Sequence, residues 1–161
     1  MSIVTVRPAL VYGPGARANL QRLIQLVRYR MPTPPAGNPR SMIGLADLCD
    51  ALCRLAEVEP GHGSVLTATD GEAYTLARLH AAISRGLGRE PGAAWLPLWS
   101  WRTACLLFDT LRGAPRRGGT FERLFSGSVH SNESLCTALG WQPRERFEDL
   151  VPVILDVEES V

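Results

Sequence analysis

The sequence predicts an α/β fold in which helices alternate with strands of a parallel sheet, and three observations support this class. Residues 2–12, SIVTVRPALVY, form a continuous apolar run rich in β-branched residues, which is typical of a strand covered on both faces. Stretches with strand and helix patterns then alternate along the chain. Only about three convincing strands are present, fewer than an independent doubly wound sheet normally contains. We therefore expect the last part of a sheet.

The first half of the chain predicts two helices separated by a loop and a strand. Residues at helical spacing after the first strand predict a helix up to about residue 29; they are Leu20, Leu23, Ile24 and Val27. The four prolines within residues 31–39 predict a loop, and RSMIGL at 40–45 predicts a short strand. A helix at 46–59 is expected to begin with Asp47 as its N-cap and to present one apolar face, made of Leu48, Ala51, Leu52 and Leu55.

The second half predicts one further strand and then mainly helices. GHGSVLTAT at 61–69 is expected to be a strand, and Thr75 is expected to cap a helix that ends at Gly86 or Gly88. An apolar, tryptophan-rich helix follows a turn at Pro91. The last two predicted helices are 131–140, closed by Gly140, and 147–160, disturbed at Pro152.

The composition limits the chemistry of the chain. The 161 residues carry a formal net charge of +1, so no broad electrostatic footprint for nucleic acid or an anionic membrane is visible. All 17 basic residues are arginine. Any mechanism that needs an amine, such as a Schiff base or a lysine that lowers the pKa of a tyrosine, is therefore excluded within this chain. We expect arginine to bind and orient anions here.

The cysteines and the apolar segments indicate a reduced, cytoplasmic protein without a membrane span. Cys49, Cys53, Cys105 and Cys136 form no C-x-x-C pair and no zinc-finger spacing, so no metal site is expected, and Cys49 and Cys53 are interpreted as small packing residues. No signal peptide is visible. The apolar region from Ala93 is interrupted by Pro97, Arg102 and Asp109, and is therefore interpreted as a buried or interfacial helix.

A glycine turn after the first strand matches a dinucleotide-binding pattern locally. Gly13, Gly15 and Ala18 fit G-x-G-x-x-A between a strand and a helix. That fingerprint also requires a second strand ending in an acidic residue about 20 positions later, where this chain has MPTPPAGNP. A structural turn is therefore the preferred interpretation.

The same stretch, VRPALVYGPG, resembles the RPxxVYGPG segment of the extended short-chain dehydrogenase family, the NAD-dependent nucleotide-sugar epimerases and dehydratases. The resemblance continues through residues 40–52, 63–91 and 122–151, where ERLFSGSVHSNESLCTALGWQPRERFEDLV is similar to the family's closing segment. It implies the C-terminal part of a Rossmann-like enzyme: the last parallel strands with substrate-domain elements at 1–90, and a smaller, mainly helical substrate-binding region at 91–161. The branch that it resembles acts in surface polysaccharide synthesis.

The resemblance also implies site residues. Arg40 stands where the family has a diphosphate-binding arginine, and Asn19 resembles an asparagine at the same diphosphate. Arg123 resembles a second arginine of that site, with Arg116 and Arg117 as the alternative. The full set of implied substrate-binding residues is Tyr12, Gly13, Asn19, Arg40 and Arg123, and Pro8 is the implied cofactor contact.

The family's glycine loop and Tyr-x-x-x-Lys pair lie in the first half of a full-length enzyme. Tyr12, Tyr29 and Tyr74 have no lysine four residues later, so no catalytic residue is assigned. We expect NAD in the full-length family and none bound by this chain alone. A nucleotide-diphosphate sugar, a second chain that supplies the NAD-binding half and a homo-oligomer are the expected partners. The alternatives are a non-catalytic interaction module, with the tryptophan-rich helix as its surface, and a decayed gene fragment.

Departures from the family pattern fall on elements that orient the substrate cleft. Gly44 replaces an aromatic residue or histidine, Ala46 and Ser131 each replace aspartate, and Ser134 replaces lysine. A strand deprived of its neighbours also exposes apolar surface and unpaired backbone. We therefore expect the isolated chain to be marginally stable or to self-associate.

Overall fold

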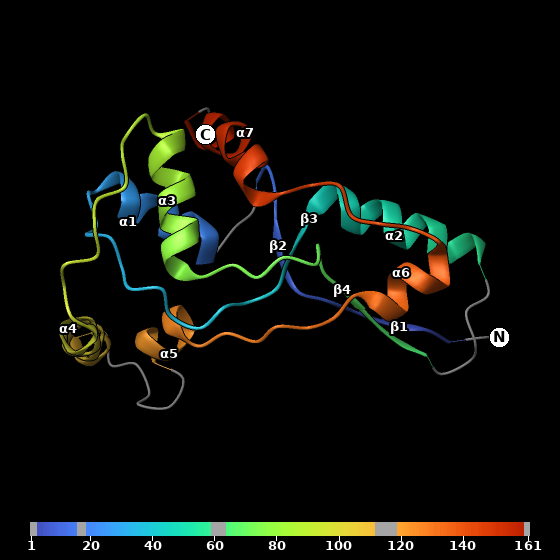
Figure 1. The fold of residues 1–161 in the computed structure, drawn as a ribbon, viewed down its shortest axis with the longest axis horizontal. Helices are drawn as coiled ribbons and strands as arrows, with labels where there is room; N and C mark the ends of the chain where they lie inside the picture. Colours follow the sequence, from blue (N-terminus) through green and yellow to red (C-terminus); the bar gives the residue numbers. More distant parts are fainter. Residues whose placement is uncertain (1–2, 16–18, 59–63, 112–118, 160–161) are drawn as a thin grey trace.

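The apolar run at the start of the chain changes partners half-way. In the computed structural model, β1 (Thr5–Pro8) pairs in parallel with β4 (Val65–Ala68), and β2 (Leu10–Tyr12) pairs in parallel with β3 (Met42–Gly44). Ala9 lies between the two strands, and its amide donates to the Ala68 carbonyl at 3.0 Å. One extended segment therefore belongs to two small parallel sheets (Figure 1).

Helices alternate with these strands along the chain, as expected for an α/β fold. The structure describes residues 3–15, 19–58, 64–111 and 119–159. The helices in these residues are α1 (Asn19–Arg28), α2 (Leu45–Glu57), α3 (Leu76–Gly86), α4 (Leu98–Leu111), α5 (Thr120–Phe125), α6 (Glu133–Leu139) and α7 (Phe147–Glu159). The short helix α5 was not expected from the sequence. Pro152 lies inside α7 without ending it.

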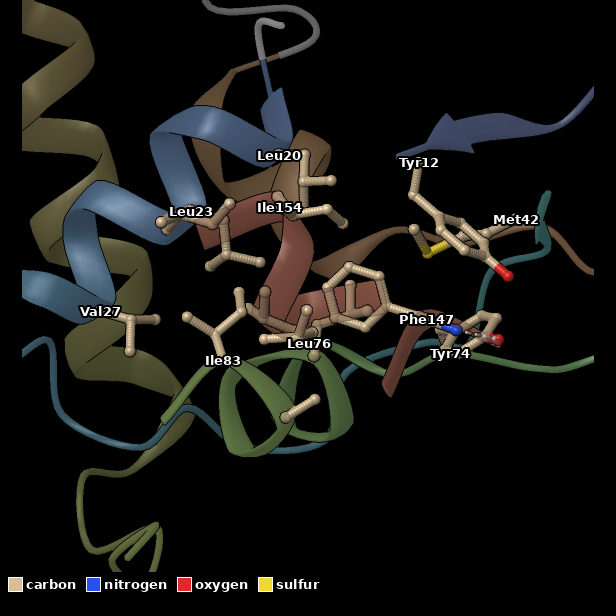
Figure 2. Packing of buried hydrophobic residues seen from close by; sticks show 14 of the residues in the cluster. Tyr12, Leu20, Leu23, Val27, Met42, Tyr74, Leu76, Ile83, Phe147 and Ile154 are labelled. Carbon is tan, nitrogen blue, oxygen red and sulfur yellow. Dashed lines mark hydrogen bonds between the residues drawn. The ribbon is translucent and has the colours of Figure 1, made fainter. Parts of the chain in front are cut away.

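One core lies among α1, α3 and α7. The four residues at helical spacing in α1 are all buried there, as predicted: Leu20, Leu23, Ile24 and Val27. Tyr12, Tyr74 and Phe147 close this core at the sheet, with ring centroids 5.6–6.2 Å apart and edge-to-face orientations (Figure 2). The end of β2 is thereby fixed to the helical layer.

A second core lies between the strands and the pair α2 and α6. Ile43, Leu66, Ala68, Leu135 and Trp141 are buried in it. Because residues 135 and 141 come from the helical region predicted at 91–161, that region and residues 1–90 share a core. The opposite face of β1 and β4 is open: Thr5, Arg7 and Val65 are exposed. The expected burial of the first strand on both faces is therefore wrong for this chain.

The helix ends test the predicted caps. Thr75 caps α3, because its hydroxyl accepts a hydrogen bond from the Arg78 amide at 3.2 Å, and Gly140 ends α6 in the left-handed conformation with φ 56°. Both predictions are confirmed. Asp47 is not the N-cap of α2: the helix begins at Leu45, and Asp47 lies in its first turn.

Several apolar side chains are more exposed than their sequence pattern predicts. Leu52 is 45% exposed, so it does not belong to the buried face of α2, and Cys49 and Cys53 are exposed rather than packed. In α4, Cys105 is buried but most of the remaining side chains face outward. No helix in the described residues has both the length and the apolar content to cross a membrane.

Candidate functional site

A cleft opens where the N-terminal segment passes from one sheet to the other. It measures about 760 Å³ and is formed by the junction of β1 and β2, the two residues before β3, Thr67 of β4, and the segment from Arg123 of α5 into the loop after it. Its lining residues are Arg7, Pro8, Ala9, Leu10, Arg40, Ser41, Thr67, Arg123, Ser126, Gly127, Ser128 and His130. The concave surface therefore lies where the N-terminal segment stops pairing with β4 and begins to pair with β3.

The lining of this cleft is cationic. Three arginines, Arg7, Arg40 and Arg123, contribute guanidinium groups, and His130 adds an imidazole. Among the described residues, those that line the cleft include no aspartate or glutamate. Guanidinium groups bind phosphate oxygens through paired hydrogen bonds, so the cleft has the chemistry of an anion site.

Arg40 is the most constrained of the three arginines. Its backbone forms an antiparallel bridge with Tyr74, with both N–H···O distances at 2.9 Å. Its Nη2 donates toward the carbonyl oxygens of Leu124 at 2.7 Å and Ser126 at 2.8 Å, at the C-terminus of α5. Burial lowers the pKa of the Arg40 guanidinium, which nevertheless stays charged. Arg40 therefore stabilises the end of α5 as well as lining the cleft.

The loop after α5 is held to Ser41, the residue before β3, by contacts at the cleft wall. Ser41 Oγ accepts a hydrogen bond from the His130 amide at 2.9 Å, and His130 Nε2 lies 3.0 Å from Ser128 Oγ. A Cβ atom at Gly127 would lie 2.1 Å from the Pro39 carbonyl oxygen, so only glycine fits this approach. The geometry of the cleft thus depends on close packing of this loop.

The structure brings three of the sequence-predicted residues together. Pro8, Arg40 and Arg123 line the same cleft. Gly13 is buried at the turn after β2, and Asn19 is the exposed first residue of α1; neither lines the cleft. The alternative phosphate residues, Arg116 and Arg117, lie outside the described residues.

Tyr12 points into the core instead of the cleft. Its side chain is fully buried, and its hydroxyl donates to Asp70 Oδ2 at 2.8 Å, next to the Tyr74 hydroxyl at 2.7 Å from the same oxygen. Burial, together with the Asp70 carboxylate, raises the pKa of both tyrosines well above the ordinary value. The structure therefore gives Tyr12 a packing role, and neither phenol is poised to accept a proton as tyrosinate.

Among the polar residues of the cleft, sequence reasoning missed the arginine Arg7 and the histidine His130. Arg7 directly precedes Pro8 at the end of β1, and its position beside a residue already assigned to the site was an available signal. His130 lies two residues after ERLFSGS, the segment that contains Arg123. It lies in a loop, however, and loop residues have no hydrophobic periodicity from which their position could be predicted. Only the tertiary contact between Ser41 and His130 places it at the cleft.

Packing accounts for the first glycine of the turn after β2. Gly13 has φ 154°, and a Cβ atom there would lie 2.9 Å from Leu45 Cβ, so packing against the first turn of α2 requires this glycine. The described residues also include no cluster of His, Cys, Asp and Glu that would hold a metal ion.

This chain resembles known proteins in both sequence and structure. No family model matches it. A UDP-glucose 4-epimerase from Vibrio cholerae is 26% identical over 152 residues, which cover 92% of this chain and 44% of that protein. A UDP-glucuronic acid 4-epimerase from Bacillus cereus, solved with NAD, superimposes with a TM-score of 0.70 at 15% identity, over 99% of this chain and 45% of that one. The chain is similar in sequence and in fold to nucleotide-sugar epimerases.

The fold is that of the C-terminal half of an extended short-chain dehydrogenase. A UDP-glucose 4-epimerase from Thermotoga maritima, solved with UDP-glucose, adds a TM-score of 0.64 at 17% identity, over 98% of this chain and 46% of that one. The chain thus spans about half the length of the proteins that it matches. The family resemblance and the fold class expected from the sequence are both confirmed.

Proposed function

We propose that this chain is the substrate-binding portion of an NAD-dependent nucleotide-sugar epimerase or dehydratase of surface polysaccharide synthesis in the cytoplasm. The observation that carries the proposal is the cleft, in which Arg7, Arg40 and Arg123 meet without an acidic neighbour among the described lining residues. A nucleotide diphosphate carries the complementary negative charge. The relatives named above include one solved with UDP-glucose.

In this proposal the chain binds and orients the substrate but does not transfer hydride. It holds no lysine, and its two buried tyrosines are hydrogen-bonded to Asp70. The NAD-binding half, with its own tyrosine and lysine, would have to be supplied by further polypeptide. The cationic cleft would then fix the diphosphate while the sugar extends toward that second half.

Titration of UDP-glucose by calorimetry tests the proposal. Because each guanidinium contributes charge-assisted hydrogen bonds, we expect Arg123→Ala and Arg7→Ala each to weaken binding about tenfold or more. Arg22→Ala is the matched control, because Arg22 is an exposed arginine on α1 outside the cleft. We expect it to change the affinity less than twofold.

Arg40→Ala is expected to abolish binding, but it also removes the hydrogen bonds to the end of α5. Arg40→Lys keeps the positive charge and loses the planar fork, so it separates charge from geometry. Unchanged affinity in both Arg7→Ala and Arg123→Ala, with folding preserved by circular dichroism, would contradict the proposed diphosphate site.

A further inference from the structure

The backbone of the loop after α5 is fixed along the segment that precedes β3. The Asn38 amide donates to the Phe125 carbonyl oxygen at 3.0 Å, and the Ser41 amide donates to the Ser128 carbonyl oxygen at 3.0 Å. Further along the loop, the His130 amide donates to Ser41 Oγ at 2.9 Å. The two segments therefore run side by side (Figure 1), and the position of the His130 backbone is set by these contacts.

Three side chains of this loop line the cleft at a spacing of two residues. They belong to Ser126, Ser128 and His130, whereas Val129 is not part of the lining. Gly127 lines the cleft as well but has no side chain. Side chains two residues apart lie on the same face of an extended segment. Of these three side chains, the imidazole is the one that can gain a positive charge at the cleft wall.

The charged groups that share the cleft with His130 are all cationic. Arg7 comes from β1, Arg40 from the segment before β3 and Arg123 from α5. The lining residue of β4 is the uncharged Thr67, and no aspartate or glutamate occurs among the described residues of the lining. The cleft therefore offers an imidazolium no carboxylate as its counter-charge, and an anion bound among the arginines would supply one.

The contact of the imidazole with Ser128 is compatible with both protonation states. His130 Nε2 lies 3.0 Å from Ser128 Oγ. A serine hydroxyl donates a hydrogen bond to a neutral imidazole nitrogen and accepts one from an imidazolium. His130 is also exposed, so protons and ligands reach its ring from solvent. The charge state of the imidazole can therefore change without loss of this contact.

We propose that His130 is a further ligand of the diphosphate and gains a proton when the anion binds, so that the affinity of the cleft rises as the pH falls. This inference rests on the proposed function. Histidine ordinarily changes its charge between about pH 5 and pH 8, whereas guanidinium groups stay charged. An anion favours the charged form of a neighbouring imidazole, and by linkage the protonated protein binds the anion more tightly.

Calorimetric titration with UDP-glucose at about pH 8 and about pH 6 tests the proposal. The diphosphate of this ligand is esterified at both ends and keeps the same charge over this range, so a pH dependence belongs to the protein. We expect binding about fivefold tighter at the lower pH. Each titration is repeated in buffers of different ionisation enthalpy, and the difference in heat measures the uptake of protons.

Two substitutions fix the charge at this position. His130→Gln stays neutral and should bind equally well at both pH values, without proton uptake. His130→Arg stays positive and should also bind equally well at both, but about fivefold more tightly than His130→Gln at the higher pH. Arg22→Ala is the control, since Arg22 lies outside the cleft and should leave the pH dependence of the unaltered chain intact. Circular dichroism at both pH values checks that each variant is folded.

The outcomes separate this inference from the proposed function. Equal affinity of the unaltered chain at both pH values would overturn the role of His130 and leave the arginine site standing. So would the same pH dependence in His130→Gln, which would assign the proton to another group such as His80, buried in α3 and outside the cleft lining. No binding of UDP-glucose at either pH would contradict the proposed function and overturn this inference with it.

Discussion

At the scale of single residues, Glu145 and Asp47 exchange hydrogen bonds across the boundary between α2 and the segment before α7. Glu145 Oε2 accepts from the amides of Ala46 at 3.1 Å and Asp47 at 3.3 Å, which caps the N-terminus of α2. Asp47 Oδ2 accepts from the amides of Arg144 at 2.9 Å and Glu145 at 2.8 Å. Each carboxylate thus satisfies backbone donors of the other segment.

This exchange accounts for one departure from the family pattern. A Cβ atom at Gly44 would lie 2.0 Å from Glu145 Oε2 and 2.7 Å from Glu145 Cβ. A larger residue at position 44 therefore excludes the Glu145 cap. The glycine at this position is required by local packing in this chain.

We predict that Gly44→Ala destabilises the fold by about 1–3 kcal/mol, because the added methyl group displaces Glu145 from α2. The free energy of unfolding in urea measures this effect. Gly92→Ala is the control, since a Cβ atom there meets nothing closer than Thr33 Oγ1 at 3.8 Å. In a Glu145→Gly background the Gly44→Ala penalty should largely disappear; an equal penalty in both backgrounds would rule out this explanation.

At the scale of elements, α4 and α5 form a unit joined at their adjoining ends by Asp109. Hydrogen bonds from the Thr120 hydroxyl and then from the Thr120 amide lower the pKa of the Asp109 carboxyl below its ordinary value. A carboxyl group with a lowered folded-state pKa favours the folded state above its ordinary pKa. That contribution is lost as the pH falls through the folded-state value.

We therefore expect the α4–α5 unit to loosen in acid, below pH 4. Tryptophan fluorescence against pH reports it, since Trp99 and Trp101 lie on α4. Asp109→Asn should remove most of this acid dependence, whereas Asp156→Asn on α7 should leave it intact. An acid transition of the same size in Asp109→Asn would show that another group controls the unit.

At the scale of the whole molecule, the sheet formed by β1 and β4 is incomplete. It has two strands in the described part of the chain, so each strand keeps one edge without a strand partner. One face of this sheet packs on α2 and α6, and Val65 on the other face is 51% exposed. Open edges and exposed apolar faces promote association between chains.

We predict that the isolated chain self-associates or unfolds at low denaturant concentration. Val65→Lys should reduce association without loss of helix content, because a charge on the open face opposes stacking of sheets. Sedimentation velocity and circular dichroism measure these properties. A monodisperse monomer with a sharp unfolding transition would show that the sheet is stable as it stands.

The sequence predicted those parts of the fold that depend on local chemistry. The burial of Leu20, Leu23, Ile24 and Val27, the Thr75 cap and the Gly140 helix end all follow from spacing and turn chemistry. The Asp47 cap was misassigned because its competitor, Glu145, is 98 residues away. Local patterns do not report contacts of that range.

The candidate site shows the same contrast between residues that a sequence motif indicates and residues that only long-range contacts bring together. Arg40 and Arg123, the latter with Arg116 and Arg117 as the alternative, were predicted through the family resemblance, and the structure places Arg40 and Arg123 at one cleft. Tyr12 was predicted from the VRPALVYGPG motif, but Asp70 holds its hydroxyl in the core. Arg7 and His130 reach the cleft only through the partner change of the strand and the Ser41 contact.

The partner change at Ala9 places one extended segment in both sheets and at the cleft. Pro8, Ala9 and Leu10 form part of the cleft wall, and the strands on either side of Ala9 pair with different partners, β4 and β3. A substitution that weakens the packing of either sheet should therefore alter the alignment of the cleft arginines, even when the substituted residue lies far from them. The affinity of the cleft for an anion would then report how tightly the two sheets are packed in the folded chain.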